Sequence, residues 1–268
     1  MNDHKIKTFF LVVVSFLAYE LLTIPFFSIA SLRKENPSET ALMRQRLDEA
    51  EGEGKTLKIA QKWISLSRIP KHVVDAIIVA EDGTFYSHGG IDWFEVRESI
   101  EKNLDKGRFA RGASTITQQL AKNLFLSTSK DPVRKFKEVL ITVLLEQFLP
   151  KHRILELYVN VIEWGKGVFG IEAASQRYFG KSASNLTLDE ATRLAAVIPS
   201  PLRHRPDEDS RYVMRRKQIV LRRMDARNFV NQTPLTGMPD TAVEDQREPV
   251  DSLDMPDSTD FDEERNGL

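Results

Sequence analysis

The feature that most constrains the fold is an apolar run of 25 residues, from Thr8 to Leu32, which only Glu20 interrupts with a charge. As a helix with a rise of about 1.5 Å per residue, this run is roughly 37 Å long, which is enough to span a bilayer. A cleaved signal peptide is the alternative, because Ser28-Ile29-Ala30 resembles a small-x-small cleavage site. The run is long for a signal peptide, so we expect a transmembrane anchor at residues 8–32, behind a short N-terminus at residues 1–7.

Charge is distributed unevenly over the rest of the chain. The 268 residues carry a net charge of −1 and no cysteine, which excludes disulfides and thiolate chemistry. Residues 231–268 hold eleven Asp/Glu and two Arg, a net −9, so residues 1–230 carry +8, the difference from the total. A basic body suits an anionic partner. We expect residues 229–268 to form an acidic, disordered tail.

Hydrophobic periodicity predicts a mainly helical, all-α body. Residues 33–70 read as a stalk and the start of the domain, and residues 71–228 as the domain itself. The segment Val139–Leu145 is apolar on all sides, which predicts a helix in the centre of the domain. No strand and no repeat is indicated. Helices are expected near Thr40–Ala50, Lys71–Glu81 and Ile91–Leu104, after Ser114 as a cap, after Asp131-Pro132, and over Lys151–Asn160, Ile171–Phe179 and Thr187–Pro199.

Two glutamates have unusual surroundings. Glu81 ends a predicted helix, at the negative pole of the helix dipole, and a Gly-terminated loop follows it. A carboxylate at that pole is disfavoured, so we expect a raised pKa there. Glu138 follows Arg134 by one helical turn, and a structural ion pair is the alternative to a catalytic role. The sequence therefore offers two candidate catalytic carboxylates on separate helices.

A polar helix face lies between these two acids in the sequence. Thr115, Gln119 and Lys122 recur at positions i, i+4 and i+7. Hydroxyl, amide and ammonium groups on one face can hold polar or anionic substrate groups, although an ordinary solvated face has the same pattern. A sugar can be transferred when one carboxylate takes a proton from the attacking hydroxyl and cations stabilise the departing group. The residues alone indicate a carboxylate enzyme that acts on an anionic substrate.

Several motifs between residues 81 and 160 stand in a distinctive order. They are Glu81-Asp82-Gly83-Thr84-Phe85-Tyr86-Ser87-His88-Gly89-Gly90, Gly112-Ala113-Ser114-Thr115-Ile116-Thr117-Gln118-Gln119, Arg134-Lys135-Phe136-Lys137-Glu138 and Arg153-Ile154-Leu155-Glu156-Leu157-Tyr158-Val159-Asn160. In their order and gaps they resemble the motifs of the family 51 peptidoglycan glycosyltransferases, over about residues 36–228. The resemblance is to the monofunctional members of this family, without a transpeptidase domain.

This resemblance implies a lysozyme-like fold with two lobes and a membrane-dipping surface between them. It implies polymerisation of lipid II into β-1,4-linked glycan strands, with release of undecaprenyl diphosphate by a single inverting displacement. Glu81 would be the general base on the acceptor's 4-hydroxyl. Glu138 would be a second essential acid, close to the diphosphate or to a divalent cation, Mg²⁺ or Mn²⁺; no tightly bound cofactor is expected. The implied substrate-binding residues are Asp82, Phe85, His88, Ser114, Thr115, Gln118, Gln119, Lys122, Arg134, Lys135 and Asn160.

The resemblance also implies a cellular location. Lipid II is polymerised outside the cytoplasmic membrane, so residues 1–7 would be cytoplasmic and the catalytic domain periplasmic, in a single-pass protein of the inner membrane. The expected partners are lipid II, the growing glycan chain, the membrane, and proteins of the divisome or elongasome. The basic stretch Arg203–Arg227 would rest near anionic head groups. No nucleic-acid motif accompanies it, so no nucleic-acid partner is expected.

Two rival functions stay open at this point. A lysozyme-like hydrolase or lytic enzyme would share the fold and an essential Glu. Cleavage within a finished glycan, however, has no diphosphate for Lys122, Arg134 and Glu138 to stabilise. A catalytically inactive membrane scaffold would not need intact acids at positions 81 and 138. The size of the products made from labelled lipid II, or from purified wall, distinguishes synthesis from hydrolysis.

Overall fold

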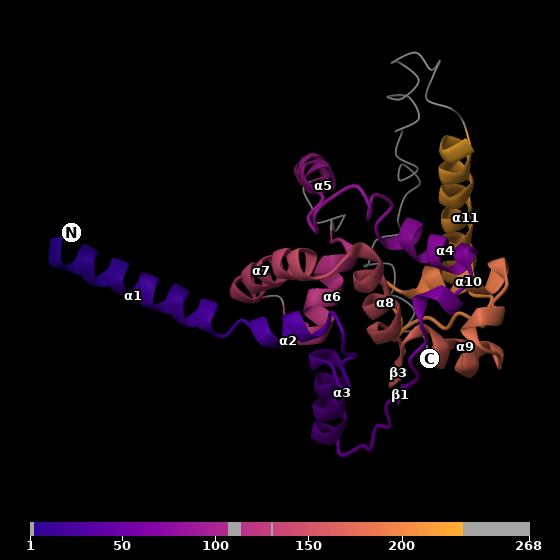
Figure 1. The fold of residues 1–268 in the computed structure, drawn as a ribbon, viewed down its shortest axis with the longest axis horizontal. Coiled ribbons are helices and arrows are strands. Elements are labelled where there is room, and N and C mark those ends of the chain that lie inside the picture. Colours follow the sequence, from indigo (N-terminus) through magenta and orange to yellow (C-terminus); the bar gives the residue numbers. More distant parts are fainter. Residues whose placement is uncertain (1–2, 107–113, 130, 233–268) are drawn as a thin grey trace, which may run out of the picture. The chain divides into compact units, whose positions relative to one another are not determined.

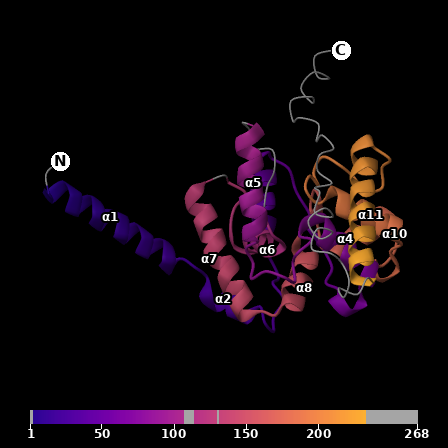
Figure 2. The ribbon, with the colours of Figure 1, turned by 90° about the horizontal axis from the view of Figure 1, so that it is seen from above.

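The computed structural model describes residues 3–106, 114–129 and 131–232. The chain divides into two compact units, Met1–Leu221 and Arg222–Leu268. The described part of the second unit is the C-terminal half of α11 (Arg211–Gln232). Residues 233–268 of the expected acidic tail lie outside the described residues. Figures 1 and 2 show the described elements from two directions.

The first unit begins with two helices rather than one. α1 (Asp3–Leu22) and α2 (Phe26–Ser31) are separated by residues 23–25, because Pro25 has no N–H to continue a helix and disfavours helical geometry in the residue before it. Residues 8–32, expected as one transmembrane span, are thus divided between two helices, with Glu20 in the last turn of α1; the membrane anchor itself stays a prediction. No helix among the described residues combines the length and apolarity that a membrane crossing requires.

Two central helices carry much of the core of this unit. α6 (Ile116–Phe125) packs against α8 (Lys151–Val161), and both α7 (Pro132–Phe148) and α3 (Ala41–Gly52) also pack against α6. Figure 1 shows α6 between α7 and α8. Three buried apolar residues of α6 recur at helical spacing: Ile116, Leu120 and Leu124. This packing fixes α6, and with it the polar positions of the second motif.

The helix α7 lies at the surface of the unit, so the prediction of a central helix at Val139–Leu145 is wrong. Val143 is 39% exposed and Phe136 46% exposed, so one side of the helix faces outward although its sequence is apolar all round. A continuous apolar run does not say which face the protein covers. The buried residues of α7 are Glu138, Ile141, Thr142 and Leu145.

A small sheet corrects the expectation of a body without strands. Its order is β1–β3–β2. β1 (Ala60–Gln61) pairs in parallel with β3 (Val168–Phe169), which pairs antiparallel with β2 (Glu163–Gly165). Gly167 in the connecting turn has φ +74°, a left-handed conformation that favours glycine. The sheet joins the segment before α4 to the segment after α8.

Most predicted helix boundaries are confirmed, and capping groups explain them. Asp131 accepts the backbone N–H groups of the first turn of α7, and Pro132 stands at its start. Thr187 and Glu190 form a capping box at the start of the helix predicted from Thr187. The remaining elements of the first unit are η1 (Leu66–Arg68), α4 (Lys71–Glu81), α5 (Trp93–Lys106), α9 (Ile171–Phe179), η2 (Ala183–Asn185) and α10 (Leu188–Val197), of which α10 packs against α4.

Candidate active site

Glu81 is the last residue of α4, and a chain of hydrogen bonds connects it to α6 and α8. Gln119 Nε2 donates to Glu81 Oε2 at 2.7 Å. Tyr158 OH donates to Gln119 Oε1 at 2.9 Å, which fixes the orientation of the amide. Burial, and after it the negative charges of Glu81 and Asp82, raises the pKa of Tyr158 well above its usual 10.0. Tyr158 therefore remains a hydrogen-bond donor, and Gln119, which Tyr158 orients, positions Glu81.

Asp82 joins the first motif to the second. Its carboxylate is buried and accepts the backbone N–H of Ile116 at 3.0 Å, at the positive end of α6. His88 Nε2 lies 2.9 Å from Asp82 Oδ1, and His88 Nδ1 accepts the N–H of Gly90 at 3.1 Å. With Nδ1 as the acceptor, Nε2 is the donor to the Asp82 carboxylate. Asp82 and His88 thus hold the loop after Glu81 in place.

The start of α6 uses two residues that the sequence assigned to substrate binding. Thr115, not Ser114, is the N-cap, which corrects the predicted cap. Thr115 and Gln118 form a capping box, with each side chain hydrogen-bonded to the backbone N–H of the other. Thr115 Oγ1 also donates to Gly90 O at 2.6 Å. Both side chains are buried and engaged by backbone, whereas Ser114 is exposed just before the helix.

Glu138 lies in the first half of α7, is 3% exposed and is bound by two cations. Arg134 Nη1 donates to Glu138 Oε2 at 2.5 Å, and Lys135 Nζ donates to Glu138 Oε1. Arg134 Nε also donates to Ser129 O at 2.5 Å, so the guanidinium bridges the helix and the preceding loop. The ion pair that the spacing predicts is present. This ion pair does not exclude a catalytic role for Glu138, because Arg134 and Lys135 beside it could also bind an anionic substrate group.

Lys122 lies in the last turn of α6 and is half-buried. Burial lowers the pKa of Lys122 below its usual 10.5, with the nearby Arg134 and Lys135 acting in the same direction. The negative charges of Glu138 and Glu81 act in the opposite direction. No ion pair or hydrogen bond within the described part of the chain holds its ammonium. A half-buried cation close to both acids is a ready binding group for an anionic ligand.

Two other predicted site residues, Phe85 and Asn160, are fully buried. Phe85 is fully buried, with Lys151 Nζ 4.4 Å from its ring centre. Asn160 is also fully buried, and its amide donates to Ile64 O and Glu156 O while its Oδ1 accepts the N–H of Ile64. This network attaches the end of α8 to the segment before α4. In this structure neither side chain is accessible to a substrate.

Two features of the site were not predicted as functional. Tyr158 stands in the fourth motif, but only the hydrogen bond from its hydroxyl to Gln119 reveals a positioning role. Gly90 has φ +92°, and a Cβ there would lie 2.8 Å from Thr142 Cγ2 and from Glu146 Cγ. The loop after Glu81 therefore passes α7 at a distance that only glycine permits. Its Gly-Gly end was the available signal in the sequence.

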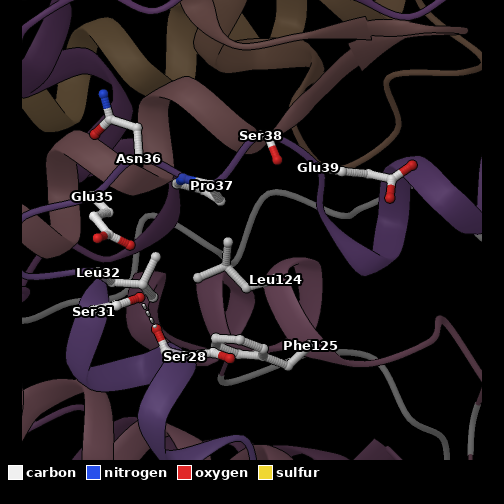
Figure 3. A pocket seen from close by; sticks show the side chains of 10 residues that line it. All are labelled: Ser28, Ser31, Leu32, Glu35, Asn36, Pro37, Ser38, Glu39, Leu124 and Phe125. Carbon is white, nitrogen blue, oxygen red and sulfur yellow. Dashed lines mark hydrogen bonds between the residues drawn. The ribbon is translucent and has the colours of Figure 1, made fainter.

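A cavity of about 330 Å³ lies apart from these motif residues. It is lined by Ser28 and Ser31 of α2, by residues 35–39, and by Leu124 and Phe125 at the end of α6. Figure 3 shows these side chains and the hydrogen bond from Ser31 Oγ to Ser28 O. Glu81, Lys122 and Glu138 are absent from its lining, so this cavity is not the candidate catalytic site.

The residues around Glu138 do not fit the divalent cation that was expected as an option there. Both carboxylate oxygens already contact cations, Arg134 and Lys135. A divalent ion prefers several oxygen ligands, and the described residues contain no cluster of three or more metal-ligating side chains.

Comparison with known proteins agrees with the motifs. The transglycosylase family model matches residues 51–225. A biosynthetic peptidoglycan transglycosylase of Herminiimonas arsenicoxydans is 43% identical over 217 residues, which are 81% of this chain and 94% of the relative. One from Janthinobacterium sp. (strain Marseille) is 43% identical over 219 residues, 81% of this chain and 95% of the relative. One from Aromatoleum aromaticum is 50% identical over 169 residues, 63% of this chain and 74% of the relative.

Proposed function

The chain belongs to the transglycosylase family of peptidoglycan glycosyltransferases, and on this premise we propose that it polymerises lipid II into β-1,4-linked glycan strands. The leaving group is undecaprenyl diphosphate. The observation that carries the proposal is the group of cations at the buried Glu138: Arg134 and Lys135 bind its carboxylate, and the half-buried Lys122 lies on the helix α6, which packs against α7. A site for a diphosphate needs such cations; a site for hydrolysis of a finished glycan does not.

The proposed reaction is one inverting displacement. Glu81 takes the proton of the acceptor's 4-hydroxyl as that oxygen forms a bond to C1 of the donor sugar. The bond from C1 to the diphosphate oxygen breaks at the same time, and its electron pair leaves with the lipid diphosphate. Gln119 orients Glu81 through its hydrogen bond. Glu81 is thus available as the base at one end of the site.

The cationic end of the site stabilises the departing diphosphate. Lys122 approaches it from α6, while Arg134 and Lys135 approach from α7, where Glu138 holds them in place. Phosphate oxygens can displace the carboxylate from part of these contacts, since charge-assisted pairing to phosphate is strong. Glu138 therefore positions Arg134 and Lys135 for the diphosphate. This positioning explains how an acid beside an anionic leaving group can be essential.

The membrane part of the proposal rests on exposed apolar side chains. Phe10 is 69% exposed, Leu22 86% and Phe27 87%, on the two N-terminal helices. Trp93 is 71% exposed at the start of α5. Exposed apolar groups in such numbers are typical of contact with lipid or protein. We include in the proposal an N-terminal anchor in the inner membrane, a periplasmic catalytic domain and a lysozyme-like arrangement of two lobes.

The direct experiment is to give the purified full-length chain labelled lipid II in detergent micelles and to separate the products by gel electrophoresis. Polymers that a muramidase digests support synthesis. Shortened strands from purified wall, with no polymer from lipid II, would favour the lytic alternative. A chain that does neither, while it still binds lipid II, would favour the scaffold alternative.

A further inference from the structure

Glu20, the one charge within the apolar N-terminal run, lies against α7. Lys137 Nζ contacts Glu20 Oε2 as an ion pair, and only 11% of the Glu20 side chain and 23% of the Lys137 side chain are exposed. The Glu20 Oε2 atom is itself buried and accepts no hydrogen bond within the described part of the chain, so the ion pair with Lys137 is the contact that compensates its charge. A buried carboxylate without a countercharge is costly. Lys137 therefore explains how a charge is tolerated in this helix.

A second contact holds the same N-terminal segment to the other end of α7. α2 packs against α7, and the rings of Phe26 and Phe148 meet edge to face with centres 5.0 Å apart. Lys137 and Phe148 are eleven residues apart, which corresponds to roughly 16 Å along a helix. Figures 1 and 2 both show α2 beside α7. The N-terminal segment thus contacts α7 at two well-separated points.

Lys137 differs from the neighbouring cations of α7 in its partner. Arg134 and Lys135 both bind Glu138, on the side of the candidate active site. Lys137 is next to Glu138 in sequence, but successive residues of a helix point about 100° apart, so its side chain turns toward α1 instead. Two adjacent residues in one turn of α7 thus have different partners: Lys137 contacts Glu20 of α1, and Glu138 contacts the proposed diphosphate-binding cations Arg134 and Lys135.

From this geometry we propose that Glu20 and Lys137 form an interhelix latch, in which Glu20 is a positioning residue for the transfer reaction. The latch fixes the end of α1 on the turn of α7 that carries Arg134, Lys135 and Glu138. The latch thereby fixes the distance between these cations and the apolar N-terminal segment. This distance should match the depth at which a membrane-embedded substrate carries its diphosphate. The kinetic part of this inference rests on the proposed function; the contact itself does not.

The contact is tested by cross-linking, because the chain has no cysteine of its own. A full-length Glu20→Cys/Lys137→Cys protein, in vesicles of phosphatidylethanolamine and phosphatidylglycerol, is oxidised and analysed by non-reducing electrophoresis. We expect an intramolecular disulfide. The control is Tyr19→Cys/Lys137→Cys, since Tyr19 is 63% exposed on another side of α1, and it should cross-link far more slowly. Equal rates for the two pairs, or no disulfide in either, would overturn the latch.

The positioning role is tested by kinetics in the same vesicles. Glu20→Gln should raise the KM for lipid II about five-fold, the equivalent of one partly exposed ion pair, with little change in kcat or in melting temperature. The exchanged pair Glu20→Lys/Lys137→Glu should restore the KM. An exchanged pair no better than Glu20→Gln, or a Glu20→Gln protein with unchanged KM, would refute the positioning role. A wild-type chain that makes no polymer would refute the proposed function instead, and cross-linking would still decide the contact.

Discussion

The side-chain amide of Gln119 donates a 2.7 Å hydrogen bond to Glu81, and the two residues come from different helices, α6 and α4. The group on Glu81 Oε2 is thus a neutral donor. Glu138, by contrast, is bound by two cations. Two carboxylates in such different surroundings can perform different tasks. Glu81 is suited to accept a proton, and Glu138 to organise positive charge.

Lys122→Met should stabilise the fold and remove activity. Burial places the folded-state pKa of Lys122 below the unfolded value, so the charged ammonium opposes folding at every pH below the folded pKa. Methionine removes this penalty, and we expect a higher melting temperature at neutral pH, with the gain shrinking as pH rises toward 10.5. Polymerisation should fall about 100-fold, as for loss of one charge-stabilising group. Calorimetry and the polymer assay measure the two effects.

The exposed control, Lys34→Met, should change neither the melting temperature nor the rate of polymerisation. A Lys122→Met protein that is less stable than the wild type, or fully active, would contradict the role assigned to Lys122.

The alkaline limit of activity should report on the same ammonium. In the substrate-free enzyme Lys122 loses its proton at a pH below the usual 10.5. Since kcat/KM reflects ionisation of the free enzyme, kcat/KM should decline on the alkaline side below that pH. Lys122→Arg keeps its charge throughout this range, so any activity it retains should lack this decline. An identical alkaline limb in the two proteins would assign it to another group.

Arg134→Ala should impair the use of the donor more than that of the acceptor. The change removes a cation from the diphosphate end and leaves Glu138, 3% exposed, with Lys135 alone. We expect the KM for the donor to rise at least about tenfold, the value of a charge-assisted hydrogen bond. Donor and acceptor are titrated separately, with a chemically blocked acceptor end on the donor. A change confined to acceptor affinity would rule out the assigned role.

Asp82→Asn tests the support of the site rather than its chemistry. The buried carboxylate accepts from Ile116 N and from His88, and an amide can satisfy only part of this. We expect unfolding in urea to require about 2 kcal/mol less free energy, as for hydrogen bonds to a charged group. An exposed control, Asp48→Asn, should change little. If Asp82→Asn were as stable as the wild type yet inactive, Asp82 would belong to the catalytic chemistry instead.

Local signals in the sequence predict most helices, because caps and periodicity are read over a few residues. Asp131-Pro132 and Thr187 mark helix starts that the structure confirms. The choice of Ser114 over Thr115 as a cap was wrong, although Gln118 stands three residues after Thr115 and marks the capping box. The short strands β1 and β3 were missed because two residues are too few to show a period.

The remaining features depend on tertiary contacts that no local pattern contains. Gln119 reaches Glu81 across 38 positions, and Lys137 reaches Glu20 across 117. The exposed side of α7 could not be inferred from Val139–Leu145, because burial is decided by the neighbouring helices. Likewise, Thr115 and Asn160 belong to recognisable motifs, and only the structure shows that their side chains hydrogen-bond to backbone groups.

The central claim is that Glu81 is the base of a glycan-polymerising site, and one comparison tests it most directly. Wild-type protein and Glu81→Gln protein are given labelled lipid II at equal concentration, and initial rates of polymer formation are measured alongside lipid II binding and melting temperature. The account predicts a loss of rate of about 100-fold or more, with binding and melting temperature close to wild type; an exposed control, Glu51→Gln, keeps full activity. A Glu81→Gln protein that polymerises lipid II at nearly the wild-type rate would contradict it.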